Sequence, residues 1–276
     1  MTTRPRAAAV AGRGLVDPTL PLVAVDDEGF ARGRAAFETL RVYAGRPFRL
    51  EEHLARLEAS AATLALPRPD RQGFRDAIDS ALAESALEDA VLRLYWTPGA
   101  DAEPLGIALV SELPAWIEAA RERGQRLVSL AFPRRSAPWL LPGTKSVSYA
   151  THVAAEAEAR RREADDAVLV DLDGTVLEGT VTNIWWREGQ TLVTPSLELG
   201  ILAGETRAAL LDLARGAGYE VETGTYPVER LHAADEVFTS SSVREVMPVV
   251  AVDQVELRSR DAAVALQRAL RVLATA

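Results

Sequence analysis

Lys145 is the single lysine of this chain, although the sequence contains 31 lysine and arginine residues in total. Arginine serves ion pairs and anion binding at least as well as lysine does. It cannot, however, form a Schiff base with an aldehyde or lose its proton near neutral pH, and lysine can do both. A genomic bias against lysine codons would also leave a lone surface lysine, so the residues around Lys145 must decide between the two interpretations.

Other segments carry residues that suit one kind of cofactor chemistry. Tyr149 follows Lys145 closely, and Glu178 lies in a run of otherwise apolar and small residues, which disfavours a free surface carboxylate. Gly204 precedes a predicted helix, so unpaired backbone N–H groups and a threonine hydroxyl would meet there, as a phosphate requires. The serines of the run 240–242 add hydroxyls and amides in a turn. A Schiff-base lysine, a buried carboxylate and a phosphate cradle are the parts that pyridoxal 5'-phosphate (PLP) requires.

The composition excludes several other kinds of site. Without cysteine, the chain has no disulfide framework, thiolate zinc site, iron–sulfur cluster or cysteine nucleophile. His53, His152 and His232 are far apart in sequence, so we expect no metal site. The net charge of −9 leaves no basic stripe for nucleic acid. No apolar run approaches the roughly 20 residues of a membrane span, and polar residues interrupt the apolar start too early for a signal peptide. We therefore expect a cytoplasmic protein without membrane or nucleic-acid partners.

Residues 1–113 are expected to form a small α+β domain. Strands are predicted at 22–25, 37–43, 91–96 and 105–110 from their apolar and β-branched residues. Helices are predicted at 51–64 and 71–87, where apolar residues recur at helical spacing. A short helical connector, 114–124, ends at a glycine and separates this domain from the rest of the chain.

Residues 125–276 are expected to form a larger, cofactor-binding domain. Its hairpin folds at Asp173-Gly174, a strong two-residue turn signal. Lys145 lies in a loop just before a helix, where a side chain can project into a cleft. The predicted elements are, in chain order, a strand at 126–132, a Pro- and Gly-rich loop at 138–144, a helix at 151–164, a hairpin over 167–186, a strand at 191–194, a loop-to-helix unit over 204–217, strands at 219–223 and 236–239, and a helix at 261–273.

The order and spacing of these segments resemble the fold-type IV, or class IV, aminotransferase family over nearly the whole chain. In the first half, residues 33–41 resemble the family's F-E-x-x-R strand and residues 52–57 its H-x-x-R-L helix. The family includes branched-chain and D-amino-acid aminotransferases, (R)-amine transaminases and aminodeoxychorismate lyases. The resemblance implies a two-domain fold of the D-amino-acid aminotransferase type, with mixed β-sheets and flanking helices. It also implies PLP in the interdomain cleft and a homodimer.

The resemblance further implies roles for individual residues. Lys145 forms the Schiff base and moves the proton between substrate and cofactor, Glu178 pairs with the pyridine nitrogen, and Tyr149 donates a hydrogen bond to the cofactor's phenolate oxygen. These three are the expected catalytic residues. From the residues alone, Arg56 could equally be a surface cation, and Tyr149 and Leu202 could be core. The expected cofactor-binding residues are Arg56, Lys145, Tyr149, Glu178, Thr182, Asn183, Leu202, Glu205, Thr206, Ser241 and Ser242, of which Arg56, Glu205, Thr206 and Ser242 are assigned to the phosphate.

The cofactor residues do not separate transamination from lyase chemistry, because both begin with proton abstraction by the same lysine. Arg32 and Arg93 are candidate partners of a substrate carboxylate, although either could form a structural ion pair. The segment 93–99 lacks the R-x-H motif of the usual bacterial D-amino-acid enzyme, and the serines of 240–242 depart from the S-G-T turn of branched-chain enzymes. The residues expected to contact substrate are Arg32, Phe37, Thr39, Arg93, Tyr95 and Val243, with Glu38 beside them.

The favoured reaction is transfer of an amino group between an amino acid, or an amine, and a 2-oxo acid, with aminodeoxychorismate lyase as the alternative. A remote alternative is a haloacid-dehalogenase-type phosphatase, because residues 171–175 match its D-x-D-G-T signature. That motif lies past the middle of the chain, an alternating strand follows it, and no lysine follows Lys145. We therefore interpret it as a hairpin turn. A cofactor-bearing protein without catalysis is disfavoured, since every catalytic position is filled.

Overall fold

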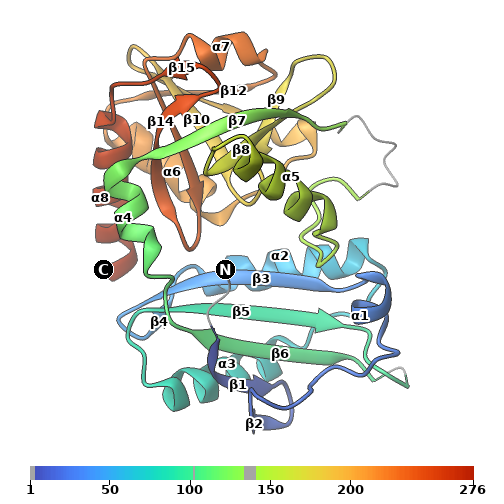
Figure 1. Cartoon of the computed structure of the whole chain (residues 1–276). Coiled ribbons are helices and arrows are strands. Elements are labelled where there is room, and N and C mark those ends of the chain that lie inside the picture. The colour runs from blue at the N-terminus through green and yellow to red at the C-terminus, as the bar shows by residue number, and fades with distance from the viewer. Residues whose placement is uncertain (1–3, 102, 134–140) are drawn as a thin grey trace. The chain divides into compact units, whose positions relative to one another are not determined.

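The computed structural model describes residues 4–101, 103–133 and 141–276, and their contacts divide the chain into two units (Figure 1). The first unit comprises Met1–Pro114 and Thr144–Tyr149, and the second comprises Ala115–Gly143 and Ala150–Ala276. The short segment with Lys145 and Tyr149 therefore belongs to the first unit, although the chain on both sides of it belongs to the second. The domain limits at 113 and 124 stay a prediction.

The first unit is built on a six-stranded antiparallel sheet with the order β2-β1-β6-β5-β3-β4. The strands expected at 37–43, 91–96 and 105–110 are β3, β5 and β6. The sheet's strands are β1 (Pro5–Val10), β2 (Gly14–Val16), β3 (Ala36–Tyr43), β4 (Arg46–Pro47), β5 (Ala90–Thr97) and β6 (Leu105–Ser111).

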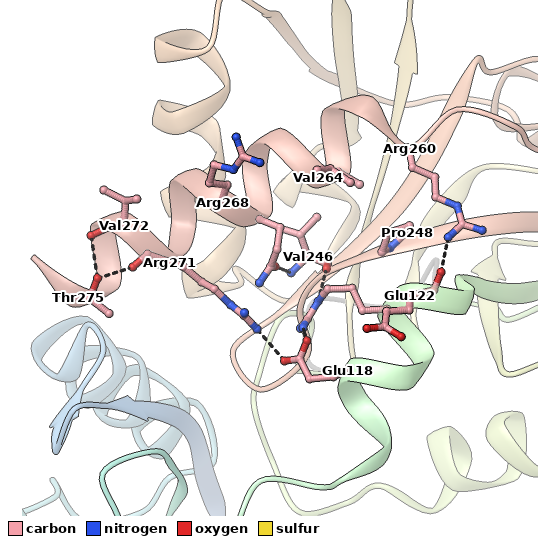
Figure 2. Close-up of a pocket in the computed structure, with 13 residues that line it drawn as sticks. Glu118, Glu122, Val246, Pro248, Arg260, Val264, Arg268, Arg271, Val272 and Thr275 are labelled. Atoms are coloured by element: carbon pink, nitrogen blue, oxygen red, sulfur yellow. Dashed lines mark hydrogen bonds and ion pairs between the residues drawn. The ribbon is translucent and has the colours of Figure 1, made fainter.

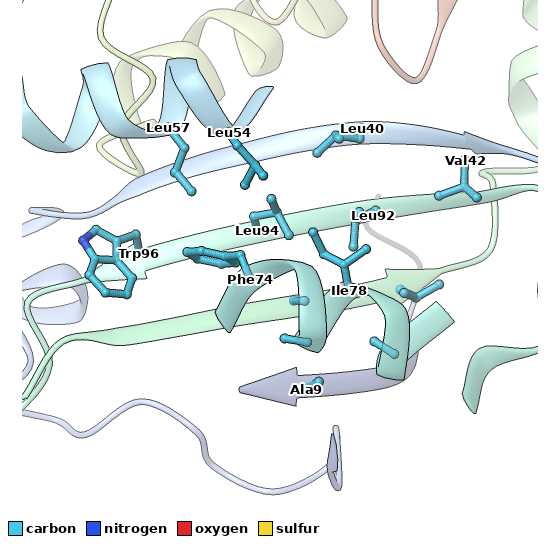
Figure 3. Close-up of a cluster of buried hydrophobic side chains, with 14 of the residues drawn as sticks. Ala9, Leu40, Val42, Leu54, Leu57, Phe74, Ile78, Leu92, Leu94 and Trp96 are labelled. Carbon is cyan, nitrogen blue, oxygen red and sulfur yellow. The ribbon is translucent and has the colours of Figure 1, made fainter. Parts of the chain in front are cut away.

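Two helices cover one face of this sheet and bury its apolar side chains (Figure 3). They are α2 (Leu50–Thr63) and α3 (Arg71–Ser85), and both confirm the helices predicted from apolar spacing. Leu54 and Leu57 of α2 and Phe74 of α3 are at most 1% exposed. Because side chains alternate along a strand, β3 turns Leu40 toward these helices and its neighbours to the opposite face.

The beginning of the chain differs from the prediction. The strand expected at 22–25 is wrong: these residues form no strand, and Val25 is 79% exposed. The alanine-rich start instead forms β1, which pairs with β6 and β2. Alanine has a low β-propensity, so local sequence gives no signal for β1, whose burial depends on its partners. The short helix α1 (Glu28–Arg32), begun by Asp27, was also not predicted.

The second unit contains a nine-stranded mixed sheet with the path β12-β11-β10-β13-β14-β7-β8-β9, while β15 pairs with β14. The pairs β11–β12, β14–β7 and β7–β8 are parallel, and the others are antiparallel. The strands are β7 (Gln125–Ala131), β8 (Asp166–Val170), β9 (Val176–Gly179), β10 (Asn183–Glu188), β11 (Thr191–Pro195), β12 (Glu220–Gly224), β13 (Glu236–Ser241), β14 (Glu245–Val252) and β15 (Val255–Glu256). Together with the first sheet, this arrangement confirms the expected α+β class.

The hairpin predicted over 167–186 exists, but its second arm is two strands. β8 and β9 pair across the Asp173-Gly174 turn, and the chain leaves β9 after Gly179 before β10 begins. β10 then pairs with β11 and β13. This break puts Glu178 at the end of one strand and Asn183 at the start of another. The D-x-D-G-T motif is thus a hairpin turn, as interpreted from the sequence.

Helices flank the second sheet. The core on one side of it contains Trp186 and Tyr226, whose rings meet edge to face at 5.3 Å, whereas Trp185 stacks on Phe238 on the opposite side. Neither β14 nor α7 was predicted. Of the loop expected at 138–144, residues 138–140 lie outside the described residues. The helices are α4 (Trp116–Arg123), α5 (Ala150–Arg161), the 3-10 turn η2 (Leu197–Leu199), α6 (Glu205–Gly216), α7 (Val228–His232) and α8 (Asp261–Thr275).

Candidate active site

Hydrogen bonds hold the backbone of Lys145 beside the start of β3. Its N–H donates to Ser60 Oγ of α2 at 3.1 Å, and its carbonyl accepts the N–H of Phe37 at 3.1 Å. Ser146 next to it forms an antiparallel bridge with Ala36 at the start of β3. The segment 144–149 therefore runs alongside β3, which explains why it belongs to the first unit.

The side chain of Lys145 lies among aromatic rings on the sheet face opposite α2 and α3. Its Nζ is 4.3 Å from the centre of the Phe37 ring, a cation–π contact. Tyr149 meets the same ring edge to face at 5.2 Å, and Tyr95 stacks on it at 6.1 Å. The structure thus brings Lys145, Tyr149, Phe37 and Tyr95 together, four residues that the sequence analysis had named for catalysis or substrate contact.

The pairing of β3 with β5 explains which polar residues share that face. Phe37 lies opposite Tyr95, and Thr39 lies opposite Arg93, so all four point to the same side of the sheet. Burial raises the pKa of the Tyr95 hydroxyl, and the charge of Arg93 opposes this in part. Arg93 therefore lies on the same sheet face as the rings of Phe37 and Tyr95.

Arg32, the other candidate for a substrate carboxylate, has a different position. It ends α1, its side chain is 77% exposed, and its guanidinium pairs with Glu28 at 3.7 Å. The structure does not bring it together with Phe37 in any contact among the described residues. Its assignment to substrate stays a prediction.

Glu38 faces away from Lys145, toward α2, and joins a buried ion-pair network. Its carboxylate accepts hydrogen bonds from Arg56 Nε at 2.8 Å and Nη2 at 2.7 Å, and His53 Nδ1 lies 2.7 Å from Oε2. Burial alone would raise the pKa of the Glu38 carboxyl, but the Arg56 charge and hydrogen bonds, with those of His53, lower it to about 2. Glu38 therefore positions Arg56 rather than facing the substrate beside Phe37.

The second unit gathers another group of candidate residues around Glu178. The Glu178 side chain is 7% exposed, and its Oε2 accepts the backbone N–H of Leu202 at 3.0 Å. The Leu202 carbonyl accepts a hydrogen bond from Asn183 Nδ2 at 2.9 Å. A β-carbon at Gly204 would lie 2.0 Å from Asn183 Oδ1, so glycine is needed there for close approach. Three predicted cofactor residues thus lie in one hydrogen-bonded chain.

The first turn of α6 and the end of β13 lie close to this group. Asn183 is paired with Ser240 in the sheet, and Gly204 immediately precedes α6 without a side-chain cap. Thr206 in the first turn is 3% exposed, and Ser241 Oγ accepts the N–H of Arg244 at 3.3 Å. The serine turn and the α6 N-terminus are the two segments to which the sequence analysis assigned the phosphate.

Two further predicted site residues, Thr182 and Val243, pack against other residues of the protein. Thr182 is 5% exposed, and a β-carbon at Gly179 would lie 2.2 Å from its Oγ1, so a larger residue there would displace the Thr182 hydroxyl. Val243 packs against Ile117 of α4 and Met247 of β14. The roles of Thr182 and Val243 stay predictions.

A groove elsewhere in the second unit contains none of these residues. Figure 2 shows this cavity of about 620 Å³ between α4, β14 and α8. Glu118 in it pairs with Arg271 at 2.7 Å and Arg121 at 2.5 Å, and both arginines also contact the fully buried carboxylate of Glu245. The two cations are thus matched by Glu118 of the groove and by the buried Glu245 next to it.

Comparison with known proteins identifies the family of the chain. The model of the family described as Amino-transferase class IV matches residues 35–252. The chain belongs to the class IV aminotransferase family. It is 33% identical over 246 residues to a bifunctional aminodeoxychorismate lyase / D-amino acid transaminase of Mycobacterium tuberculosis, covering 83% of this chain and 85% of that protein.

Solved structures of class IV aminotransferases agree with the sequence comparison. A fold IV-transaminase from Curtobacterium pusillum has a TM-score of 0.90 and 34% identity, covering 98% of both chains. A hypothetical aminotransferase from Mycobacterium tuberculosis, in a PLP-bound form, has a TM-score of 0.91 and 30% identity, covering 96% of this chain and 98% of that one. The expected family and its two-sheet architecture are confirmed.

The described residues of this class IV aminotransferase show neither a metal cluster nor a membrane helix. Nowhere in residues 4–101, 103–133 and 141–276 do three or more His, Asp or Glu side chains gather as a metal ion requires. Within the same ranges, every helix falls short of the length and hydropathy needed to cross a membrane.

Some residues that shape the site were missed from the sequence. Ser60 fixes the backbone of Lys145 from α2, and His53 of the same helix contacts Glu38. Arg207, directly after Thr206, is buried beside Trp185. Only its position in the run 200–207 could have drawn attention to Arg207, whereas the contact of Ser60 depends wholly on tertiary structure.

Proposed function

We propose that this protein transfers an amino group between an amino acid, or an amine, and a 2-oxo acid, with PLP as cofactor and Lys145 as catalytic residue. Family membership supports the reaction class. The observation that carries the residue assignment is the position of the only lysine, with its ammonium 4.3 Å from the Phe37 ring and Tyr149 on the same ring.

The chemistry of the available donors fits PLP. Lys145 provides the amine for covalent attachment, Glu178 a buried carboxylate for a pyridine nitrogen, and the α6 N-terminus with Thr206 provides donors for a phosphate. Bound PLP supplies an aldehyde that accepts the amino group and a ring that withdraws electrons from the substrate's α-carbon. Asn183, Thr182, Leu202, Glu205, Ser241, Ser242 and Arg56 complete the proposed cofactor site.

The chain's own residues divide the remaining work. Lys145 Nζ takes up and returns the proton of the substrate carbon, because it is the flexible base next to the aromatic group. The Leu202 N–H orients the Glu178 carboxylate through its bond to Oε2. Glu38 holds the Arg56 guanidinium in a fixed plane, which limits the conformational freedom of a phosphate-binding side chain.

The sheet face that carries Phe37 and Tyr95 is the proposed substrate surface. Arg93 shares this face and is our preferred partner for a substrate carboxylate, since guanidinium binds carboxylate with two parallel hydrogen bonds. Thr39, opposite Arg93, supplies a hydroxyl. Arg32 and Val243 are retained as proposed substrate contacts.

Aminodeoxychorismate lyase is the second candidate activity. The observation in its favour is that the Mycobacterium tuberculosis relative combines lyase and D-amino acid transaminase in its name. Incubation with D- and L-amino acids plus pyruvate or 2-oxoglutarate, beside incubation with aminodeoxychorismate, separates the two. Pyruvate release from aminodeoxychorismate without any amino transfer would refute our first proposal.

Borohydride trapping tests the catalytic assignment directly. We expect the purified protein with PLP to absorb in the violet region, and borohydride to remove the band and fix the cofactor to Lys145. Lys145→Ala should lack the band and lose at least about 10³-fold in kcat. No second lysine side chain competes, because the sequence contains one lysine. Cofactor fixed at the N-terminal amine instead would contradict the assignment.

We also propose a homodimer, a cytoplasmic location and the domain division 1–113, 114–124 and 125–276. The support for the dimer is the resemblance to the family, and the absence of cysteine fits a reducing compartment. Light scattering of a fully active monomer would contradict the dimer.

A further inference from the structure

Arg207 is a buried cation that has no carboxylate partner among the described residues. It is the third residue of α6 and is 5% exposed. Its Nη2 donates to the Pro195 carbonyl at 3.0 Å, whereas its Nε is buried without a hydrogen-bond partner. No Asp or Glu forms an ion pair with it within the parts of the chain that the structure describes. Burial accordingly lowers the pKa of the guanidinium. An unpaired buried charge is costly, so this residue needs an explanation.

Its place in the helix makes the cost larger. Arg207 lies in the first turn of α6, where the helix dipole is positive and disfavours a cation. Arg215, in the last turn of the same helix, lies where the dipole favours a cation; its side chain is 60% exposed and pairs with Asp212. Arg230 of the same unit is matched by Glu188 and Glu222. Arg207 has no such compensation from the protein.

The contacts of Arg207 connect it to both segments of the proposed phosphate site. Its guanidinium carbon is 6.0 Å from the centre of the Trp185 ring, and Trp185 Nε1 donates to Ser240 Oγ at 3.0 Å. Ser240 directly precedes Ser241 and Ser242. At the other segment, a β-carbon at Gly204 would lie 3.4 Å from the β-carbon of Arg207.

We infer that Arg207 is an electrostatic positioning residue of the phosphate site, whose charge is balanced by the dianionic phosphate of the cofactor instead of by a side chain. The inference rests on the proposed function. The first turn of α6 contains the carboxylate of Glu205, but the buried guanidinium of Arg207 forms no ion pair with it or with any other described carboxylate. A buried cation without a counter-charge disfavours the empty site and favours a phosphate over an uncharged group, because charges interact strongly across buried surroundings.

The test compares Arg207→Met and Arg207→Lys with the matched control Arg215→Met at the other end of α6. For each apoprotein, the affinity for PLP and for pyridoxal, which lacks the phosphate, is measured by absorbance titration. We expect Arg207→Met to weaken PLP binding about tenfold or more and to change pyridoxal binding less than about twofold. Arg207→Lys should restore part of the preference for PLP, and Arg215→Met should match the wild type.

A second measurement does not use the loaded enzyme. Unfolding of each apoprotein in urea is followed with and without inorganic phosphate. We expect apo Arg207→Met to be at least as stable as the wild type, because an unpaired buried charge is removed, and to gain less stability from phosphate. A residue with a merely structural role would instead destabilise the apoprotein when replaced.

The results distinguish the inference from the proposed function. Equal losses of PLP and pyridoxal affinity in Arg207→Met, or a destabilised apoprotein with an unchanged response to phosphate, would overturn the inference alone. A wild type that binds no PLP would refute the proposed function, and this inference with it.

Discussion

Glu38 and Arg56 show how a single ion pair can serve both stability and the site. The Glu38 carboxylate is fully buried, and Arg56 donates to Oε1 through Nε and to Oε2 through Nη2. His53 Nδ1 also lies next to Oε2. The motif that contains Glu38 was recognised from the sequence, but the residue was expected beside the substrate. Alternation along β3 decides otherwise: residues 36, 38 and 40 face α2, and residues 37 and 39 face Lys145.

We expect Glu38→Gln to lower the free energy of unfolding by about 3–5 kcal/mol at pH 7, because Arg56 is left buried without its counter-charge. The folded-state pKa of about 2 lies below the ordinary 4.5, so the wild-type advantage is complete above pH 4.5 and is lost as the pH falls toward 2. Urea unfolding at pH 7, 5, 4 and 3 measures the free energy of unfolding of the wild type and of Glu38→Gln. The difference between these two free energies should become smaller below pH 4.5.

The control is Glu51→Gln on α2, the helix that also carries Arg56. Glu51 is 55% exposed and pairs with Arg75, so its replacement should cost less than about 1 kcal/mol at every pH. A difference between wild type and Glu38→Gln that stays constant from pH 7 to 3 would contradict the assignment of a depressed pKa to Glu38.

At the scale of elements, one side chain holds the backbone of the segment before α6. Asn183, at the start of β10, is 4% exposed and donates a hydrogen bond to the Leu202 carbonyl. Its Oδ1 occupies the position next to Gly204 that a β-carbon would need. The predicted helix after Gly204 is confirmed, since the glycine that precedes it is a local signal. The contact of Gly204 with Asn183 is not local, and no sequence pattern shows it.

Gly204→Ala and Gly216→Ala, at the two ends of α6, should have opposite effects on the free energy of unfolding. The β-carbon at Gly204 displaces the Asn183 amide, so we expect a loss of about 1–3 kcal/mol in unfolding free energy. Gly216 ends α6 with nothing within 4 Å of its β-carbon, so alanine there should stabilise by about 0.5–1 kcal/mol. Urea denaturation of both variants checks the signs, and equal effects would count against the close approach at Gly204.

At the scale of the whole molecule, the residues that we propose for the cofactor are divided between the two units. Lys145, Tyr149 and Arg56 belong to the first, and Glu178 and Thr206 to the second. Each unit has its own core, one around Phe74 and the other around Trp186. A ligand that binds residues of both must stabilise both against unfolding.

We therefore expect PLP to slow amide hydrogen exchange in both β3 and α6. At 100 times its dissociation constant the ligand should add about 2.7 kcal/mol to the free energy of unfolding. Hydrogen exchange read by mass spectrometry, with Lys145→Ala as the comparison, measures both regions at once. Protection confined to one unit would contradict a site built from both.

The sequence by itself determined the family, the cofactor and most elements. A lone lysine, a carboxylate among small residues and a glycine before a helix are features of residue type and spacing, and such local signals survive without coordinates. Regular apolar spacing likewise predicted α2 and α3, because the residues of a helix repeat with its own period.

Only the tertiary structure decided the direction and the partners of the side chains. Strand pairing places Arg93 on the face of Phe37, and it makes a buried strand of the alanines at the chain's start. Burial leaves Arg207 without a counter-charge, although nothing in the run 200–207 separates it from a surface arginine. Desolvation and pairing arise between segments distant in sequence, so the charge balance of the site exists only once the chain is folded.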